Sequence, residues 1–508
     1  MPVAVSYPGV HVQETSGGVR SFPGVATSIT ALLGRALRGP VDEPVAITGF
    51  ADFERIFGGL WVESALGFSV RDFFMNGGSR AIIVRMYQAP VAGARRQALI
   101  EAGTLRLQAR DPGVWGNALQ VQIEDDAFSD DAFSLSVRDN ATGQLEIFRG
   151  VSVVPGHPRQ GDRVLLNESR LSVAAGALPD AKPAATICPV LENGKAVPEG
   201  LLSDASFIGA ASIAEKRGLH ALDQADLFNI LCIPPYIARG DDMLGGDVDK
   251  EVVAAAASYC EGRRAMLLVD APSAWDDAAA AAVGVKGVGT ASRNAALFFP
   301  RLMEAIAERG GQVSAMAPCG AIAGILARTD VNRGVWEAPA GIDTALNGVE
   351  GLSVAVSDAE NRLLNPLGIN CLRAMNAAGR IVWGARTLQG DDLLGSEWKY
   401  IPVRRTALYI EESVYRGTQW AVFEPNDEPL WAQIRLNVGA FLHDMFRQGA
   451  FQGMTPSEAY FIKCDRETTT GEDSNRGIVN ITVGFAPLKP AEFVVITIQR
   501  IAGQGTSA

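Results

Sequence analysis

The sequence predicts a mixed α/β (α+β) protein of several domains, and three observations lead to this fold class. Short apolar runs alternate with helical patterns over residues 28–97 and 201–394, which is typical of a three-layer α/β core with a largely parallel sheet. Residues 98–200 contain short alternating strands and many turns, as in a β-rich inserted domain exposed to solvent. Residues 395–489 combine an amphipathic helix with a period-2 strand, which indicates a C-terminal α+β domain.

The chain begins with residues 1–27, which we interpret as an arm. Val10 and Val12 alternate with polar residues in a short strand, and the glycine pair Gly17 and Gly18 then loosens the backbone. The first core segment follows the arm. Its predicted elements are a strand at 29–33, a loop at 34–40, helices at 49–57 and 64–75, and a buried strand at 81–86.

The inserted region and the second core segment differ in pattern. Phe133, Leu135 and Val137 alternate with serines before a turn at 140–143, which predicts a hairpin. In the second core segment the predicted strands lie at 227–234, 265–270 and 294–299, and the predicted helices lie at 249–262 and 314–327. Further strands at 369–372 and 380–385 lead into the C-terminal domain.

The C-terminal domain is predicted as a helix, a strand, a second helix, a loop and a strand. Asp427 can cap the second helix, and Pro429 suits its first turn. One side of this helix carries an apolar stripe of Trp431, Ile434, Val438, Leu442 and Met445, and the other side carries Gln433, Leu436, His443 and Arg447. The predicted strand has Val479, Ile481, Val483 and Phe485 in alternation with polar residues and a glycine.

The last segment, residues 490–508, forms a second arm. Pro487 and Pro490 make a stiff, extended connector, and residues 492–501 form a strongly β-prone strand beyond it. An exposed apolar strand edge recruits a partner, so this strand pairs either with its own sheet or with another chain. Because both ends of the chain are strand-forming segments on tethers, exchange of strands between subunits is one of the two possibilities.

Composition limits the possible partners and the compartment. The net charge of −12 and the lack of a Lys/Arg run argue against nucleic acid and against an anionic membrane surface as partners. No run of residues is long and apolar enough to insert into a membrane, and no signal peptide is visible, so we expect assembly in the cytoplasm. The six cysteines are spread along the chain and are typical of buried core residues in a reducing compartment.

No catalytic, cofactor-binding or metal-binding residue can be assigned from the sequence. A dinucleotide fingerprint, a P-loop, a nucleophile elbow and the common zinc spacings are all missing, and the glycines of residues 284–290 have the wrong spacing for a phosphate cradle. Asp270 ends an apolar run where a magnesium ligand could sit, but we interpret it as a cap of the turn that follows. This lack of a recognisable constellation favours a structural protein.

Several stretches of the chain match one known family. They are residues 7–14 (YPGVHVQE), 34–40 (GRALRGP), 72–78 (DFFMNGG), 111–117 (DPGVWGN), 229–235 (NILCIPP), 423–431 (FEPNDEPLW), 455–461 (TPSEAYF) and 484–494. Together they resemble the sheath subunits of contractile tails, which occur in phages, R-type tailocins and extracellular contractile injection systems. The β-rich region matches poorly beyond its first residues, as expected of the variable, outward-facing insertion of that family.

The resemblance implies a role in assembly. Sheath subunits stack as rings of six around an inner tube, contract without a cofactor to drive the tube through a target envelope, and meet baseplate and terminal cap proteins in a phage tail-like particle. It also implies site residues. The inter-subunit linker strands would contain Val3, Val5, Val10, Val12, Phe493, Val495, Ile496 and Ile498; the acceptor sheet would contain Val479, Ile481, Val483 and Phe485; and the tube would face Gln433, Leu436, His443 and Arg447.

Two other classes remain open from the residues alone. One is a soluble α/β enzyme with an unrecognised active site and an ordinary C-terminal strand. The other is a different ring-forming protein, such as a tube or baseplate component.

Overall fold

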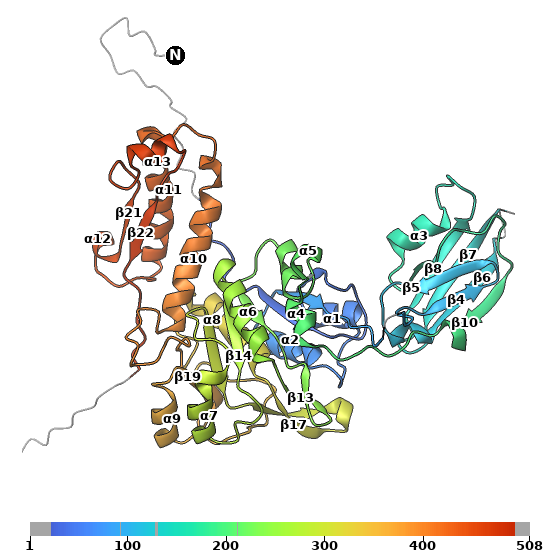
Figure 1. Cartoon of the computed structure of the whole chain (residues 1–508), viewed down its shortest axis with the longest axis horizontal. Coiled ribbons are helices and arrows are strands. Elements are labelled where there is room, and N and C mark those ends of the chain that lie inside the picture. Colours follow the sequence, from blue (N-terminus) through green and yellow to red (C-terminus); the bar gives the residue numbers. More distant parts are fainter. Residues whose placement is uncertain (1–21, 92, 127–130, 211, 493–508) are drawn as a thin grey trace, which may run out of the picture. The chain divides into compact units, whose positions relative to one another are not determined.

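The computed structural model describes residues 22–91, 93–126, 131–210 and 212–492, and these residues form two compact units (Figure 1). The C-terminal unit contains residues 22–25, Gly334–Glu337 and 405–492. The core unit contains the other described residues and includes the β-rich insertion. The mixed α/β, multidomain fold class is confirmed.

An eight-stranded sheet organises the core unit, in the order β2-β3-β1-β11-β14-β15-β19-β20. The six inner strands are parallel, and the two edge strands β2 and β20 are antiparallel to their neighbours. These strands are β1 (Thr30–Gly34), β2 (Pro44–Ile47), β3 (Ala81–Arg85), β11 (Ile230–Cys232), β14 (Met266–Asp270), β15 (Ala295–Phe299), β19 (Ile369–Met375) and β20 (Gly379–Trp383).

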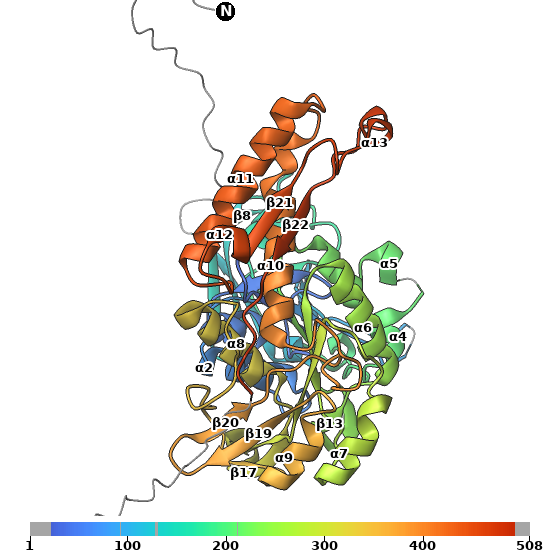
Figure 2. The ribbon, with the colours of Figure 1, turned by 90° about the vertical axis from the view of Figure 1, so that its left-hand side faces the viewer.

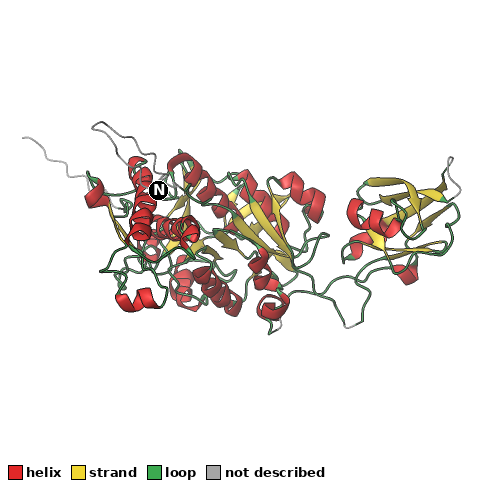
Figure 3. Ribbon diagram, turned by 90° about the horizontal axis from the view of Figure 1, so that it is seen from above, coloured by secondary structure: helices red, strands yellow, loops and turns green. Residues whose placement is uncertain are grey.

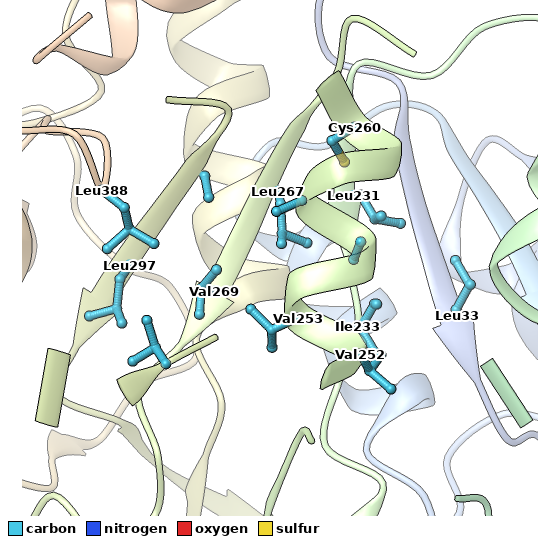
Figure 4. Packing of buried hydrophobic residues seen from close by; sticks show 14 of the residues in the cluster. Leu33, Leu231, Ile233, Val252, Val253, Cys260, Leu267, Val269, Leu297 and Leu388 are labelled. Atoms are coloured by element: carbon cyan, nitrogen blue, oxygen red, sulfur yellow. The ribbon is translucent and has the colours of Figure 1, made fainter. Parts of the chain in front are cut away.

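Both faces of this sheet are buried. Successive side chains of a strand point to opposite sides of the sheet, and the two sets belong to two different core clusters. Leu33, Leu231 and Leu267 face one core cluster, where Val252, Val253 and Cys260 of α6 (Lys250–Gly262) approach them (Figure 4). Leu32, Cys232 and Leu268 face a second cluster. The helices that contribute to the second cluster are α1 (Phe50–Phe57), α2 (Leu66–Met75) and α8 (Cys319–Arg333).

Short elements connect the strands of the core unit. The hairpin β12 (Ile237–Arg239) with β13 (Asp242–Asp247) follows β11, and β16 (Leu302–Ile306) pairs with β17 (Gln312–Met316) and β18 (Gly351–Leu352). The remaining helices are α4 (Asp204–Ile208), α5 (Ser212–Glu215), α7 (Ala278–Gly284) and α9 (Asp358–Leu364).

The helix predicted at 314–327 is partly wrong. Residues 314–316 belong to β17, where Ser314 pairs with Glu304, and α8 begins only at Cys319, directly after Pro318. The alanine-rich pattern after Pro318 is helical, but pairing with β16 keeps the preceding residues extended.

The insertion has the predicted β-rich structure, with strands shown in yellow at the right of Figure 3. One sheet has the order β10-β6-β7-β8 and the other has the order β4-β5-β9. Its elements are β4 (Leu99–Ala102), β5 (Leu105–Ala109), β6 (Leu119–Asp125), β7 (Ala132–Asp139), β8 (Leu145–Ser152), α3 (Gly161–Glu168), β9 (Ser172–Ala174) and β10 (Thr186–Pro189). The hairpin predicted from Phe133, Leu135 and Val137 is confirmed as β7 and β8, and all three side chains are buried.

The C-terminal unit consists mainly of helices packed on a short hairpin sheet. Its elements are α10 (Ile401–Gly417, whose first four residues belong to the core unit), α11 (Glu428–Arg447), α12 (Pro456–Ala459), β21 (Tyr460–Lys463), α13 (Gly471–Asn475) and β22 (Thr482–Phe485). The strand predicted between the two long helices is wrong, because residues 418–427 form a 3-10 turn at Gln419–Ala421 and irregular backbone. The partner of β22 is instead β21, which follows α11.

Candidate subunit interface

The long helix α11 is built as its sequence predicts. The Asp427 side chain accepts a hydrogen bond from the backbone N–H of Leu430, and Pro429 lies in the first turn. The whole predicted stripe is buried in the core of the C-terminal unit, as shown by Trp431, Ile434, Val438, Leu442 and Met445. This packing fixes which face of α11 remains available to a partner.

The opposite face of α11 carries the four residues that the sequence singled out. Leu436, His443 and Arg447 are exposed, and Gln433 is half-buried. The Nδ1 atom of His443 lies 3.3 Å from the Tyr460 hydroxyl, which ties the helix to β21. The four residues therefore share one accessible face.

A two-stranded antiparallel sheet, β21 with β22, lies along α11 (Figures 1 and 2). Tyr460 is opposite Phe485, and Ile462 is opposite Val483. Gly484 is required here, because a Cβ at this position would lie 2.1 Å from the ring of Phe461 across the sheet. Among the described residues no third strand joins this sheet, so each strand has one unpaired edge.

The predicted acceptor residues divide into two pairs. Val483 and Phe485 lie in β22, whereas Val479 and Ile481 lie in the segment just before it. All four side chains are half-buried against the core of the C-terminal unit. The strand is shorter than predicted, since residues 478–481 have no strand partner in the part of the chain that the structure describes.

The proposed linker residues lie outside the described residues. These are Val3, Val5, Val10, Val12, Phe493, Val495, Ile496 and Ile498. The structure does show how the connector to the second arm begins. The backbone N–H of Gln452 donates to the Ala486 carbonyl, and Phe451 forms a bridge with Pro487, so the chain is held to its own unit up to that proline.

The carboxyl edge of the large sheet is occupied by paired side chains. Folds of this kind bind ligands where the strand order reverses, which here lies between β1 and β11. Arg35 follows β1 directly, and its Nε atom lies 2.8 Å from Oε1 of Glu199. Arg85, the last residue of β3, is fully buried and donates to the carbonyl oxygens of Ala36, Gly39 and Pro112. These charged groups are held by structural contacts.

Asp270 has a different partner from the one predicted. Its Oδ1 atom accepts a hydrogen bond of 2.9 Å from the backbone N–H of Cys319, the first residue of α8, rather than from the turn that follows β14. Burial raises the pKa of Asp270 to about 6. The carboxylate therefore joins a strand to a helix that lies 49 residues further along the chain.

Other features can be stated for the described part of the chain. No three His, Cys, Asp or Glu side chains are grouped there as a metal site requires. None of the helices described has both the length and the apolar character needed to cross a bilayer. All six cysteines are free, and all are buried except the half-buried Cys188.

Comparison with known proteins gives consistent results. A family model described as the phage tail sheath protein central domain matches residues 227–388, and one described as the phage tail sheath C-terminal domain matches residues 395–501. The two matches together span just over half of the chain. A tail sheath protein of Burkholderia phage BcepMu is 26% identical over 484 residues, which cover 88% of this chain and 87% of that protein.

Solved structures share the fold. The sheath complex of the extracellular contractile injection system PVC, in its contracted state, matches with a TM-score of 0.59 and 20% identity over 98% of both chains. A chain of the anti-feeding prophage (AFP) baseplate matches with a TM-score of 0.57 and 21% identity, covering 98% of this chain and 100% of that one. These comparisons do not support the α/β-enzyme alternative.

Proposed function

Because this chain belongs to the contractile tail sheath family, we propose that its copies polymerise as stacked rings of six around an inner tube. The chain is a structural subunit of a contractile sheath, the component of a phage tail-like particle whose shortening drives the tube through a target envelope. Its work comes from rearranged contacts between subunits. The single observation that carries the proposal is the two-stranded sheet of β21 and β22 in a chain with these two family matches.

The sheet is suited to accept strands from neighbouring subunits. A two-stranded sheet is marginal alone, and its open edges can pair with extended segments of another chain. The donors in this proposal are residues 3–14 and 493–501, with Val10 and Ile496 as representatives. Main-chain pairing on a tether allows the subunits to rotate while they stay joined, because the tether absorbs the movement.

We also propose a role for the accessible face of α11. Gln433, Leu436, His443 and Arg447 lie together on the side opposite the buried stripe, so this face can rest on the inner tube. The proposed particle further includes baseplate and terminal cap proteins and assembles in the cytoplasm, with no contact to nucleic acid and no insertion into a membrane. The domain limits at 27, 97, 200, 394 and 489 are part of the same proposal.

Removal of the second arm tests the polymerisation. Deletion of residues 492–508 should leave a folded, soluble chain that forms no cylinders, because the proposed donor strand is lost while β21 and β22 remain. Negative-stain electron microscopy reads the result as hollow, striated cylinders or separate particles. A matched deletion of residues 504–508 keeps the β-prone segment and should assemble normally.

Three outcomes would contradict this account. If the chain without residues 492–508 still forms cylinders, the arm is not the linker. If it unfolds, the arm belongs to the core of its own subunit. If the unaltered protein forms narrow, smooth tubes, the chain is a tube component rather than a sheath.

The proposed tube contact needs its own test. Leu436→Asp should abolish co-sedimentation of the sheath subunit with preformed inner tubes and leave the fold intact, because Leu436 is 52% exposed. Leu363→Asp is the matched control, since Leu363 is 51% exposed on α9 in the core unit. Equal tube binding by both variants would show that this face of α11 does not meet the tube.

A further inference from the structure

The loop between β20 and α10 displays two consecutive leucines to solvent. Leu393 is 93% exposed and Leu394 is 61% exposed. Single exposed leucines are common on protein surfaces, and two adjacent ones with this exposure form a candidate contact surface. We call Leu393 and Leu394 the leucine knob.

Hydrogen bonds and ion pairs hold the knob in place. Oδ1 of Asp391 accepts the backbone N–H of Leu393 at 2.9 Å, and the backbone N–H of Asp392 donates to the Pro366 carbonyl at 3.0 Å. The Asp392 carboxylate also lies 3.0 Å from the guanidinium of Arg386, which is itself fully buried. A knob that is already ordered loses little conformational entropy when a partner binds it.

The charges around the knob suit a contact between copies of this chain. The net charge of −12 produces a long-range repulsion between two copies of the chain. Next to the knob, the charge of the Asp392 carboxylate is balanced, because Arg386 and Lys399 both lie within ion-pair distance of it. The pairing of Asp392 with these two cations reduces the repulsion that a second copy would meet at the knob.

The C-terminal unit contains an apolar groove of about 520 Å³. At one side, Val422 and Phe423 are exposed, and Phe423 has a φ of 74°, a backbone conformation that an aromatic residue rarely adopts. Leu430 and Ile434 of α11 line the groove as well. The full lining consists of Thr418, Ala421, Val422, Phe423, Glu424, Asn426, Leu430, Ile434, Gly477, Val479 and Ile481.

The leucine knob and the apolar groove are two different surfaces of the chain, and a polymer needs a contact of this kind. A contact between two identical patches closes at a dimer, whereas a contact between two different patches continues into a ring or a helix. Other cavities suit an apolar knob less well. One is lined by Arg96, Lys216 and Arg217, another by four arginines, and a third has a volume of only about 80 Å³.

We propose that the leucine knob of one copy docks into the apolar groove of a second copy. This inference rests on the proposed function, since it assumes that copies polymerise, but it adds a side-chain contact to the exchange of strands. Val479 and Ile481 of the groove also belong to the proposed acceptor segment, but the positions that the test changes, Leu393, Leu394 and Val422, lie outside that segment and outside β21 and β22. The loss of one contact is therefore distinguishable from the loss of the other.

Two variants with substitutions at exposed positions test the contact in the full-length chain. The knob variant is Leu393→Ser with Leu394→Ser, and the groove variant is Val422→Asp; all three side chains are exposed, so the variants should fold. We expect each variant to need at least about tenfold more protein to form cylinders, because two buried leucine side chains are lost from each contact. Ile342→Ser, at another exposed aliphatic residue, is the control and should assemble like the unaltered chain.

Mixing the two variants makes the test specific. The groove variant keeps its knob and the knob variant keeps its groove, so an equimolar mixture should sediment as 1:1 dimers at a concentration where each variant alone is monomeric. If either variant forms cylinders at the same protein concentration as the unaltered chain, the proposal is overturned, even if that variant no longer binds the tube. A mixture that stays monomeric would also overturn it. If the unaltered chain forms no cylinders, the proposed function fails, and the mixing experiment still decides the knob contact by itself.

Discussion

The indole N–H of Trp431 donates a hydrogen bond of 2.8 Å to Oδ1 of Asn426, and Asn426 in turn donates from Nδ2 to the Ile478 carbonyl at 3.0 Å. Asn426 precedes α11, and Ile478 belongs to the segment that leads into β22. One side chain thus joins the long helix to the approach of the proposed acceptor strand. The same side chain lines the apolar groove.

We predict that Asn426→Ala lowers the free energy of unfolding of the C-terminal unit. The substitution leaves the indole N–H of Trp431 and the Ile478 carbonyl without this partner, at a cost of about 1–3 kcal/mol. Urea unfolding followed by tryptophan fluorescence measures the change. Asn332→Ala, at an exposed position of α8, is the control and should change stability by less than about 0.5 kcal/mol. If Asn426→Ala lowers the free energy of unfolding no more than Asn332→Ala does, the two hydrogen bonds of Asn426 do not stabilise the C-terminal unit.

Two leucines of α11 should respond very differently to truncation. Leu442 is fully buried in the core of the C-terminal unit, so Leu442→Ala removes packed atoms and should cost about 2–5 kcal/mol. Leu436→Ala on the opposite face should change stability by no more than about 0.5 kcal/mol. Chemical denaturation of both variants measures the difference. Similar values would show that the helix does not bury the predicted stripe.

Helices α2 and α8 approach closely at Gly320. A Cβ at this position would lie 2.1 Å from the carbonyl oxygen of Ser69, so Gly320→Ala forces one helix to move. We expect a loss of about 1–3 kcal/mol in the stability of the core unit, measured by thermal or urea unfolding. Gly262→Ala in α6 meets no atom within 4 Å, so this control should be neutral or stabilise by up to about 1 kcal/mol. A neutral Gly320→Ala would refute the close approach.

The buried carboxyl of Glu304 should make the core unit less stable as the pH rises. Glu304 and Asp72 share the guanidinium of Arg71, and both carboxyl groups are buried. Burial, together with the negative charge of Asp72, raises the pKa of Glu304 to about 9, above its usual value near 4.5. Between these two values the folded chain keeps a proton that the unfolded chain releases, so stability falls with rising pH, by at most about 1.4 kcal/mol per pH unit.

Glu304→Gln tests this pH dependence. Glutamine stays neutral in the folded and the unfolded chain, so the variant should show a flatter decline of stability from about pH 5 to about pH 9. Urea unfolding across that range measures the slope. Glu101→Gln, at an exposed carboxyl of the insertion, is the control and should keep the slope of the unaltered chain. If the stability of Glu304→Gln changes with pH as steeply as that of the unaltered chain, the proton that causes the decline is bound by another group.

The elements predicted best are those whose sequence pattern and packing agree. The stripe from Trp431 to Met445 repeats every three or four residues, and the structure buries all of it. The errors arise where pairing partners decide the backbone. The pattern of residues 314–316 predicts helix, but these residues pair with β16. The sequence does not predict β21, because Tyr460–Lys463 is only four residues long and is stabilised by β22 nineteen residues later.

The sequence by itself determined the class of the protein: the helical and strand periods, the cap of α11 and the family resemblance all lie in local residue order. Only the tertiary structure decided which edges of β21 and β22 stay open, that Asp270 bonds to the start of α8, and that Leu393 and Leu394 stand in solvent. The physical reason is that pairing, burial and exposure depend on residues far apart in the chain, and a local pattern does not specify which of them meet.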